Sequence, residues 1–338
     1  MNQPDVLIDA DTRRHVVEGV AQALDTMYVF PDAGHTMSEA LLAALEAHDY
    51  DGLTTSDAFC ERLTHDLQAV SSDKHIRVRY NEEARTIGGS PEEPSAEELA
   101  QWIAQARSVN FGFYKVERLA GNVGYLDLRN FWDVTLPGAG ETALAAMNLL
   151  YHTDALIVDL RKNGGGSPSM IAFLTSFLVN AEPVHLNSFY ERQGDKTRQV
   201  WTLPYIPGPR TPDKPVYVLT GNRTFSGAEE FAYNLKNLKR ATIIGETTGG
   251  GAHPGGDISV TPHFRVFVPI GRPINAISGT NWEGTGVEPD ISVPQEEALN
   301  HAYRLALAGI IANLGDNPTG AGKTQAAEAR SALEEQRA

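Results

Sequence analysis

Apolar residues recur at helical spacing in three stretches of the first 70 residues. The apolar faces consist of Val16, Val20, Leu24 and Met27, then Met37, Leu41 and Leu45, and then Phe59, Leu63, Leu67 and Val70. Spacings of three and four residues place such side chains on one side of a helix. Asp11 or Thr12 can cap the first helix, which ends before Pro31. The pattern predicts a small three-helix bundle.

After this bundle, apolar residues recur at every second position of the sequence. Ile76, Val78 and Tyr80 alternate with arginines, which is typical of a half-buried strand. We therefore predict an amino-terminal helical bundle over residues 1–80 that ends in a short strand. Residues 81–98 are rich in Glu, Pro, Ser and Gly, and they are predicted to form a linker.

Residues 99–313 alternate between strand and helix signals, which indicates an α/β domain. The predicted elements are a hairpin over residues 116–128, helices near residues 139–150 and 167–179, and strands over residues 155–160, 216–219 and 264–268. Residues 180–214 are rich in Pro, Arg and aromatic residues and predict a long loop. Such a loop commonly shapes substrate access, although its aromatic residues can simply attach it to the core.

Residues 314–338 are polar and charged, and they predict a C-terminal tail that forms a loose helix. This tail contains GAGKT at residues 320–324. A phosphate-binding P-loop requires a glycine five residues before Gly322, where this chain has Asn317. We therefore expect no nucleotide at this motif.

Ser226 stands where a predicted strand becomes a predicted helix. Residues 216–219 form a short apolar run that predicts a strand. Gly221 allows the backbone to turn after this strand, and apolar residues at helical spacing follow Ser226. One explanation is a capping box, in which Ser226 and Glu229 satisfy two N–H groups at the helix start. The other is a nucleophilic hydroxyl that points into a cleft beside N–H donors.

Four motifs favour the second explanation. In chain order they are DLRKNGGG, TFSGAEEF, GETTGGGAHP and WEGTGVEPD, within residues 120–295. With these motifs the chain resembles the serine peptidase family of the C-terminal processing proteases and the tricorn core protease, closest to members like interphotoreceptor retinoid-binding protein. The resemblance implies an α/β protein in which the helical bundle precedes a β-β-α spiral domain like those of crotonases and the Clp protease.

The resemblance also implies a serine hydrolase with Ser226 as its nucleophile. A serine hydroxyl needs a base that removes its proton during attack. The processing proteases use a lysine some two dozen residues later, but glycines at 249–251 fill that loop here, and Lys236 and Lys239 lie on the predicted helix. A lysine base is therefore not expected.

A histidine base is implied instead. In the tricorn-like members the base lies in an Asp-x-His context, which Asp73-Lys74-His75 matches, so His75 is the expected base. Glu283 in WEGTGVEPD occupies the place of the acidic residue that orients it. His253 is a competing base. Backbone N–H groups of Gly165, Gly166 and Gly227 are expected to form the oxyanion hole.

Two functions are consistent with these features. The first is a serine peptidase that cleaves short peptides or small amides through an acyl-enzyme. The alternative is a non-catalytic module on the same fold that binds an apolar ligand similar to a retinoid or fatty acid, because fold alone does not decide function. We expect no cofactor, and the ten histidines include no close ligand pair that would predict a metal site.

The composition of the chain limits which classes of binding partner are expected. The formal net charge of −15 without a dense basic cluster argues against binding to nucleic acid or an anionic membrane. Cys60 is the single cysteine, which excludes an intrachain disulfide. It is expected to be a packing residue of a helix and not a reactive thiol. The opening residues contain no apolar signal segment, which predicts a cytoplasmic protein, or an exported one if a signal peptide has been removed. A homo-oligomer is compatible with the sequence.

Overall fold

The computed structural model describes residues 5–87 and 96–336. The chain forms two compact units. The first unit contains Met1–Pro94, Ser188–Arg198 and His253–Ile274, and the second contains Ser95–Asn187, Gln199–Ala252 and Asn275–Ala338. Each unit is thus built from segments that are distant in sequence. The boundaries predicted at residues 80, 98 and 313 stay a prediction, and residues 88–95 of the predicted linker lie outside the described residues.

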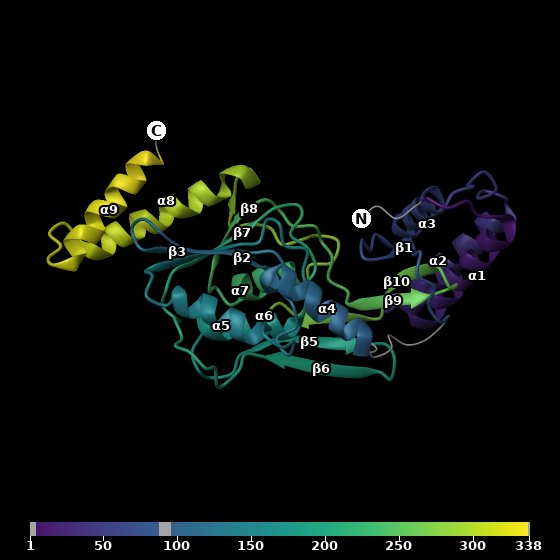
Figure 1. Cartoon of the computed structure of the whole chain (residues 1–338), viewed down its shortest axis with the longest axis horizontal. Coiled ribbons are helices and arrows are strands. Elements are labelled where there is room, and N and C mark those ends of the chain that lie inside the picture. The colour runs from purple at the N-terminus through teal and green to yellow at the C-terminus, as the bar shows by residue number, and fades with distance from the viewer. Residues whose placement is uncertain (1–4, 88–95, 337–338) are drawn as a thin grey trace. The chain divides into compact units, whose positions relative to one another are not determined.

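Three helices form the amino-terminal part of the first unit, which confirms the prediction from the apolar pattern (Figure 1). They are α1 (Ala10–Met27), α2 (Pro31–Glu46) and α3 (Ser56–Ser71). They accompany an antiparallel sheet with the order β1 (Arg77–Tyr80), β10 (Phe264–Pro269) and β9 (Gly255–Ser259). The three helices and the sheet share one apolar core, in which Cys60 is buried. Burial raises the pKa of the Cys60 thiol to about 12, so this cysteine is a packing residue.

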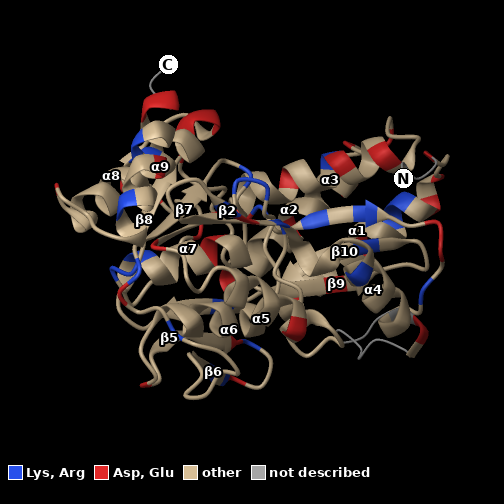
Figure 2. Cartoon of the chain, turned by 60° about the vertical axis from the view of Figure 1, so that its left-hand side comes forward, with Lys and Arg blue, Asp and Glu red and all other residues tan. Residues whose placement is uncertain are grey.

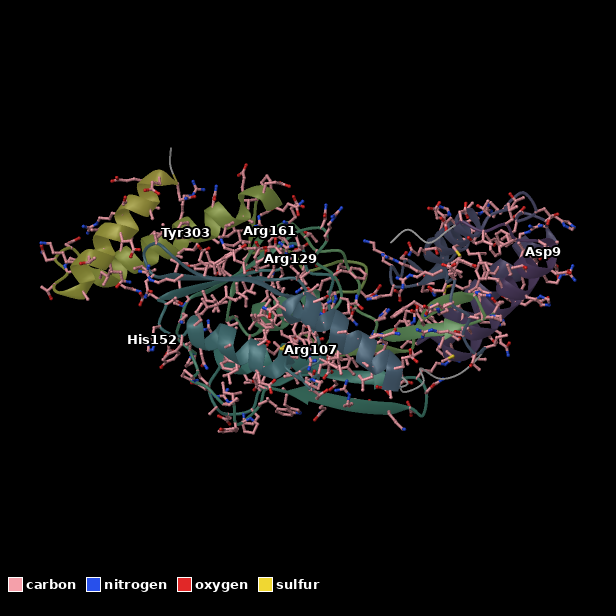
Figure 3. All side chains as sticks on the ribbon, viewed as in Figure 1. Asp9, Arg107, Arg129, His152, Arg161 and Tyr303 are labelled. Carbon is pink, nitrogen blue, oxygen red and sulfur yellow. The ribbon has the colours of Figure 1, made fainter. Side chains whose placement is uncertain are left out.

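Asp9 caps helix α1, and the prediction of Asp11 or Thr12 as the cap is wrong. The Asp9 carboxylate accepts a hydrogen bond from the Thr12 N–H at 2.8 Å, at the position labelled in Figure 3. Its backbone is extended, with φ −96° and ψ 177°, as an N-cap requires. The cap lies further from the first apolar residue than the pattern suggested, because polar residues fill the first turn.

The second unit is organised around a six-stranded mixed sheet with the order β12-β8-β7-β4-β3-β2. Its strands are β2 (Phe113–Leu119), β3 (Val123–Leu128), β4 (Ala155–Asp159), β7 (Val216–Thr220), β8 (Thr242–Gly245) and β12 (Ile291–Ser292). Strands β2 and β3 pair antiparallel, which confirms the predicted hairpin, and the other neighbours pair parallel. Helix α4 (Ala96–Ser108) and a short 3₁₀ turn, η1 (Asn110–Gly112), precede β2.

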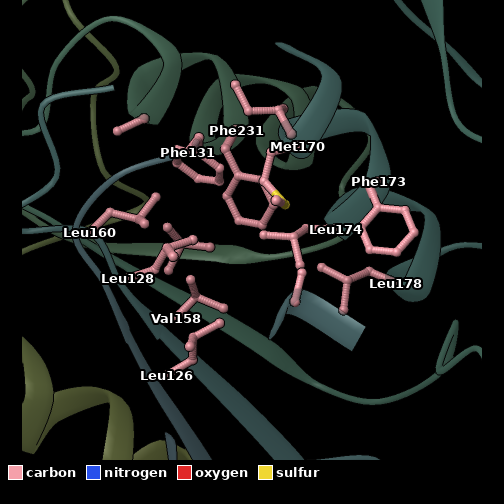
Figure 4. Packing of buried hydrophobic residues seen from close by; sticks show 14 of the residues in the cluster. Leu126, Leu128, Phe131, Val158, Leu160, Met170, Phe173, Leu174, Leu178 and Phe231 are labelled. Atoms are coloured by element: carbon pink, nitrogen blue, oxygen red, sulfur yellow. The ribbon is translucent and has the colours of Figure 1, made fainter. Parts of the chain in front are cut away.

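Helices cover both faces of this sheet. Helices α5 (Ala139–Leu149), α6 (Pro168–Leu178) and α7 (Gly227–Asn237) pack on the face that carries Leu126 and Val158. Figure 4 shows these two residues with Leu174 of α6 and Phe231 of α7. Helices α8 (Gln295–Leu314) and α9 (Ala321–Glu335) pack on the face that carries Val123 and Ile157. Strands that are buried on both faces tend to appear in sequence as continuous apolar runs, which explains the run at residues 155–158 of β4.

Two segments are more regular than their composition indicated. The prediction of a long loop over residues 180–214 is wrong, because this segment contains β5 (His185–Glu191) and β6 (Lys196–Trp201). With β11 (Gly271–Asn275) they form a third sheet of the order β11-β5-β6. The predicted tail contains α9, whose alanines Ala326, Ala329 and Ala332 are buried. Small side chains allowed this helix to pack without an obvious apolar stripe.

Acidic residues lie on exposed turns of helices in both units, for example on α3 and α9 (Figure 2). Within residues 5–87 and 96–336, no helix is both long and apolar enough to cross a membrane.

Candidate active site

Ser226 joins the strand β7 segment to helix α7 in an unusual backbone conformation. Its φ is 54° and its ψ is −122°. A residue with a Cβ in such a sparsely populated region costs about 1–3 kcal/mol of strain. An ordinary N-cap is extended and needs no such strain, whereas the nucleophile of an α/β-hydrolase sits on a sharp, strained turn from strand to helix. The backbone of Ser226 therefore favours the nucleophile over a simple cap.

This strain predicts a difference between two variants that both lack the hydroxyl. Ser226→Gly is expected to be more stable than Ser226→Ala by about 0.5–2 kcal/mol, because glycine relieves the strain but gains entropy in the unfolded chain. Urea unfolding followed by circular dichroism measures the difference. Equal stabilities, or a less stable glycine variant, would show that Ser226 is unstrained.

Glu229 holds the turn from inside helix α7. Its carboxylate is 0% exposed and accepts the Ser226 N–H at 2.8 Å. The same carboxylate accepts hydrogen bonds from the Thr248 hydroxyl at 2.5 Å and from the N–H groups of Gly250 and Gly251 at 2.6 and 2.9 Å. The contact of Glu229 with the Ser226 N–H, which a capping box requires, is thus present, and the same carboxylate also binds the glycine loop of residues 249–251.

The pKa of Glu229 reflects this position. Burial raises the pKa above its usual value, and the four hydrogen-bond donors oppose the effect without cancelling it. These donors compensate a carboxylate that is removed from water. Glu229 therefore links Ser226 rigidly to residues 248–251.

Gly165 and Gly166 form the opposite side of the Ser226 turn. Their φ values are 116° and 136°, a region that strongly favours glycine. A Cβ on Gly165 would lie 2.8 Å from both Ser226 Cβ and Gly227 N, and a Cβ on Gly227 would lie 2.6 Å from Gly166 O. The structure thus brings the three predicted glycines together with Ser226.

Asn163, which the sequence analysis missed, fixes this glycine loop. Its side chain is 0% exposed, its Nδ2 donates to the Leu128 carbonyl at 2.9 Å, and its Oδ1 accepts the Gly165 N–H at 2.8 Å. Its own carbonyl accepts the Phe225 N–H at 3.1 Å. The Gly165 N–H is therefore committed to Asn163. The available signal was a polar residue placed between a buried strand and a glycine run.

An ion pair anchors the same loop at the end of β4. Arg161 Nη2 lies 2.6 Å from Asp159 Oδ2, and Arg161 Nη1 donates to the Gln295 carbonyl at 2.6 Å. The Tyr125 hydroxyl donates to the same Asp159 carboxylate at 2.8 Å. Arg161 is labelled in Figure 3. These contacts fix the start of the chain segment that leads into the glycines.

Both candidate bases lie beside one buried carboxylate in the first unit. Asp73 is 1% exposed, and its Oδ2 lies 2.8 Å from His253 Nδ1. Its Oδ1 lies 3.6 Å from His75 Nδ1 and accepts the His75 backbone N–H at 3.0 Å. The Tyr28 hydroxyl also donates to Asp73, at 3.2 Å. Asp73 is a candidate orienting residue, a role that its place in the Asp-x-His motif did not predict.

The ionisation of Asp73 follows from these contacts. Burial acts to raise its pKa, but hydrogen bonds with His253 and His75 outweigh burial and hold the pKa well below its usual range. Asp73 is therefore a carboxylate at neutral pH. A carboxylate beside a ring nitrogen fixes the tautomer and orientation of the imidazole.

Aromatic rings restrict both histidines further. His75 stacks on Phe267 with ring centroids 5.8 Å apart, and His253 meets the edge of Phe30 at 5.3 Å. The two imidazoles have 10% and 5% of their side-chain surface exposed, respectively. His75 is thus the more accessible of the two.

Glu283 lies in the second unit and is tied to the glycine loop after β8. Its Oε2 accepts the Ala252 N–H at 2.5 Å, and its N–H donates to Asn281 Oδ1 at 2.9 Å. The neighbouring Trp282 donates its ring N–H to the Gly251 carbonyl at 2.7 Å. Ser226, Glu229, residues 248–252 and Glu283 therefore belong to one hydrogen-bonded framework. The pairing of either histidine with Ser226 or Glu283 stays a prediction, because the histidines belong to the other unit.

The sequence of this chain is similar to those of known peptidases. The profile described as Peptidase family S41 matches residues 122–293, half of the chain, and that of the N-terminal domain of peptidase S41 in eukaryotic IRBP matches residues 10–109. The carboxy-terminal-processing protease of Bartonella bacilliformis is 29% identical over 199 residues, which are 55% of this chain and 42% of that protein. The tricorn protease of Thermoplasma volcanium is 26% identical over 187 residues, 52% of this chain and 16% of that protein. The chain thus spans less than half the length of either relative.

The structure also has solved counterparts. A lipoprotein from Streptococcus agalactiae superimposes with a TM-score of 0.57 over 91% of this chain and 99% of that chain, at 14% identity. At this identity the likeness shows the fold alone. A mixed α/β fold with an amino-terminal helical region is confirmed, and the crotonase-like spiral stays a prediction. By the extent of the profile match and by its motifs, this chain belongs to peptidase family S41.

Proposed function

We propose that this chain is a serine peptidase that cleaves peptide bonds through an acyl-enzyme on Ser226. The observation that carries the proposal is the strained Ser226 backbone, with φ 54° and ψ −122°, between the buried Glu229 carboxylate and the Gly165-Gly166 loop. Strain of this kind persists where the surrounding structure enforces it, and it concentrates at active sites. Membership of peptidase family S41 supports the same activity.

The proposed chemistry assigns one role to each group. Ser226 Oγ attacks the peptide carbonyl while His75 takes its proton and then gives it to the leaving amine. A water activated by the same histidine then hydrolyses the ester. The N–H groups of Gly166 and Gly227 stabilise the oxyanion, because the Gly165 N–H is bound to Asn163.

Two acidic residues are candidates to orient the base. Glu283 is the residue implied by the family motif, and Asp73 is the carboxylate that contacts both His75 and His253. His253 remains the alternative base. Its place 2.8 Å from Asp73 supports a role in holding that carboxylate.

Short peptides or small amides are the proposed substrates. Family membership and the strained serine favour catalysis over the alternative of an apolar-ligand module. A cytoplasmic location, or export after removal of a signal peptide, stays a prediction, as does a homo-oligomer.

Covalent labelling tests the proposal directly. A fluorophosphonate probe is expected to label the intact wild-type protein at one site, and Ser226→Ala is expected to abolish labelling, because the probe reacts only with an activated serine. Intact-protein mass spectrometry measures the adduct. Ser108→Ala, at an exposed serine of α4, is the matched control and should label like the wild type. Absence of an adduct on the wild type would contradict the proposed function.

A further inference from the structure

Asp133 lies on the loop after β3 and binds the start of helix α6. Its Oδ2 accepts hydrogen bonds from the hydroxyls of Ser167 at 2.7 Å and Ser169 at 2.9 Å. Its Oδ1 accepts the Thr135 N–H at 2.9 Å and the Thr135 hydroxyl at 2.6 Å. Burial acts to raise the pKa of Asp133, but hydrogen bonds from Thr135, Ser167 and Ser169 outweigh burial and lower the pKa. Asp133 is therefore a carboxylate at neutral pH, and both of its oxygens are bound.

Ser167 is the residue through which this carboxylate reaches the glycine loop. It directly follows Gly166 in the chain, and it is the N-cap of α6, where its hydroxyl oxygen accepts the Ser169 N–H at 3.3 Å. Its backbone N–H donates to the Phe131 carbonyl at 2.6 Å. One hydrogen bond from the backbone and one from the hydroxyl thus tie Ser167 to residues 131–133.

Phe131 holds the other side of Gly166. The Phe131 N–H donates to the Gly165 carbonyl at 2.9 Å, and a Cβ on Gly166 would lie 2.2 Å from the Phe131 carbonyl oxygen. Phe131 is 1% exposed and packs against Phe231 of α7, with ring centroids 5.5 Å apart (Figure 4). The C=O and N–H of a planar trans peptide point in opposite directions. The hydrogen bond to the Gly165 carbonyl therefore turns the Gly166 N–H away from Phe131.

Gly166 cannot set its own conformation. Its φ of 136° is accessible to glycine, but glycine adopts many other conformations as readily. The contacts of the neighbouring residues therefore decide where the Gly166 N–H points. Hydrogen bonds weaken steeply when the donor tilts, so a small rotation of this peptide would weaken its stabilisation of an oxyanion.

We propose that Asp133 is a positioning residue of the oxyanion hole, which acts through Ser167 on the Gly166 N–H. The proposal rests on the proposed function, in which that N–H stabilises the oxyanion. A purely structural role is the alternative, because a carboxylate at the start of a helix also stabilises the helix. Only positioning predicts a loss that is selective for the transition state.

The kinetics of Asp133→Asn test this role. An amide has a single acceptor oxygen, so asparagine cannot accept hydrogen bonds on both sides, from the Ser167 hydroxyl and from the Thr135 N–H. On a quenched-fluorescence peptide, kcat is expected to fall about 10- to 100-fold, less than for loss of a whole oxyanion-hole donor. KM should change by less than about twofold, because an interaction made only in the transition state is weakened. A peptide boronic acid, whose serine adduct is tetrahedral like the transition state, should lose affinity by the same factor as kcat falls.

Variants of Ser167 test the route of this effect. Ser167→Ala is expected to reproduce the loss, whereas Ser167→Thr keeps a hydroxyl and should retain most of kcat. The double variant of Asp133→Asn and Ser167→Ala should lose no more than either single variant, because both remove the same hydrogen bond. Asp154→Asn is the matched control, since it alters an exposed carboxylate of the same unit, bound to the Asn122 amide at 2.6 Å, and should keep both kinetic constants. Thermal unfolding of each variant shows whether it is folded.

A folded Asp133→Asn variant with unchanged kcat would overturn the proposal, as would one in which KM rises while the affinity for the boronic acid stays the same. Equal kcat values in Ser167→Ala and Ser167→Thr would also overturn it, and this comparison decides the question if Asp133→Asn does not fold.

These outcomes differ from failure of the proposed function. A wild-type protein that hydrolyses peptides and reacts with the fluorophosphonate probe, but in which Asp133→Asn has no kinetic effect, is a peptidase whose oxyanion hole does not depend on Asp133. A wild-type protein that neither hydrolyses peptides nor reacts with the probe would overturn both proposals.

Discussion

Peptide turnover is expected to fall about a million-fold when His75 is replaced by alanine, because the base and the nucleophile of a serine hydrolase act as a unit. His253→Ala is expected to reduce turnover much less, since in the proposed mechanism His253 only helps to hold Asp73. The measurement is kcat/KM on a quenched-fluorescence peptide at neutral pH, together with the rate of fluorophosphonate labelling.

A matched control distinguishes this effect from general loss of a histidine. His35 lies in the same unit, has 62% of its side chain exposed and contacts Asp25 at 3.0 Å, so His35→Ala should leave turnover unchanged. A larger loss in His253→Ala than in His75→Ala would assign the base to His253. Equal losses in both would indicate that the pair works only as a unit around Asp73.

The substitution Asp73→Asn is expected to lower turnover by about ten thousand-fold, because an amide cannot hold the histidine tautomer that a carboxylate selects. It should also lower the free energy of unfolding at pH 7 by about 1–3 kcal/mol, the cost of leaving buried partners unsatisfied. Kinetic assays and urea unfolding measure the two effects separately.

The stability effect has a definite pH dependence. The folded-state pKa of Asp73 lies below the ordinary aspartate value. The ionised carboxylate therefore stabilises the protein fully above about pH 4, and this contribution is lost as the pH falls toward the folded-state pKa. The difference between wild type and Asp73→Asn should shrink on acidification. A difference that does not change with pH would contradict the ionised Asp73, and Asp25→Asn at an exposed site is the control.

The elements of the fold could largely be predicted from the sequence, because apolar periodicity is a local property. Helix α3 begins at Ser56 and β2 pairs with β3 as the pattern indicates. The position of Ser226 before α7 follows from the same local signals. The motifs around it identified the family, since their order along the chain is specific even where each motif is short.

The local pattern failed where long-range contacts decide the structure. The aromatic and arginine-rich segment 180–214 forms β5 and β6, because β11 pairs with β5 from a distant part of the chain. The helix in the C-terminal tail was predicted, but its packing was not, because its buried residues are alanines, which give a weak apolar signal. The partner of β5 lies far away in sequence, whereas α9 packs mainly on α8, the helix directly before it.

In the candidate site, too, some features follow from the sequence and others only from the tertiary structure. The sequence by itself determined which residue types are present: a serine at a helix start, two glycine loops and two histidines. Only the tertiary structure decided that Ser226 has a φ of 54° and that Asn163 holds the Gly165 N–H. Likewise, one buried Asp73 carboxylate contacts His75 and His253, which lie 178 residues apart in the chain. Strain, burial and shared hydrogen bonds arise only from packing between distant segments, and no local pattern of residues encodes them.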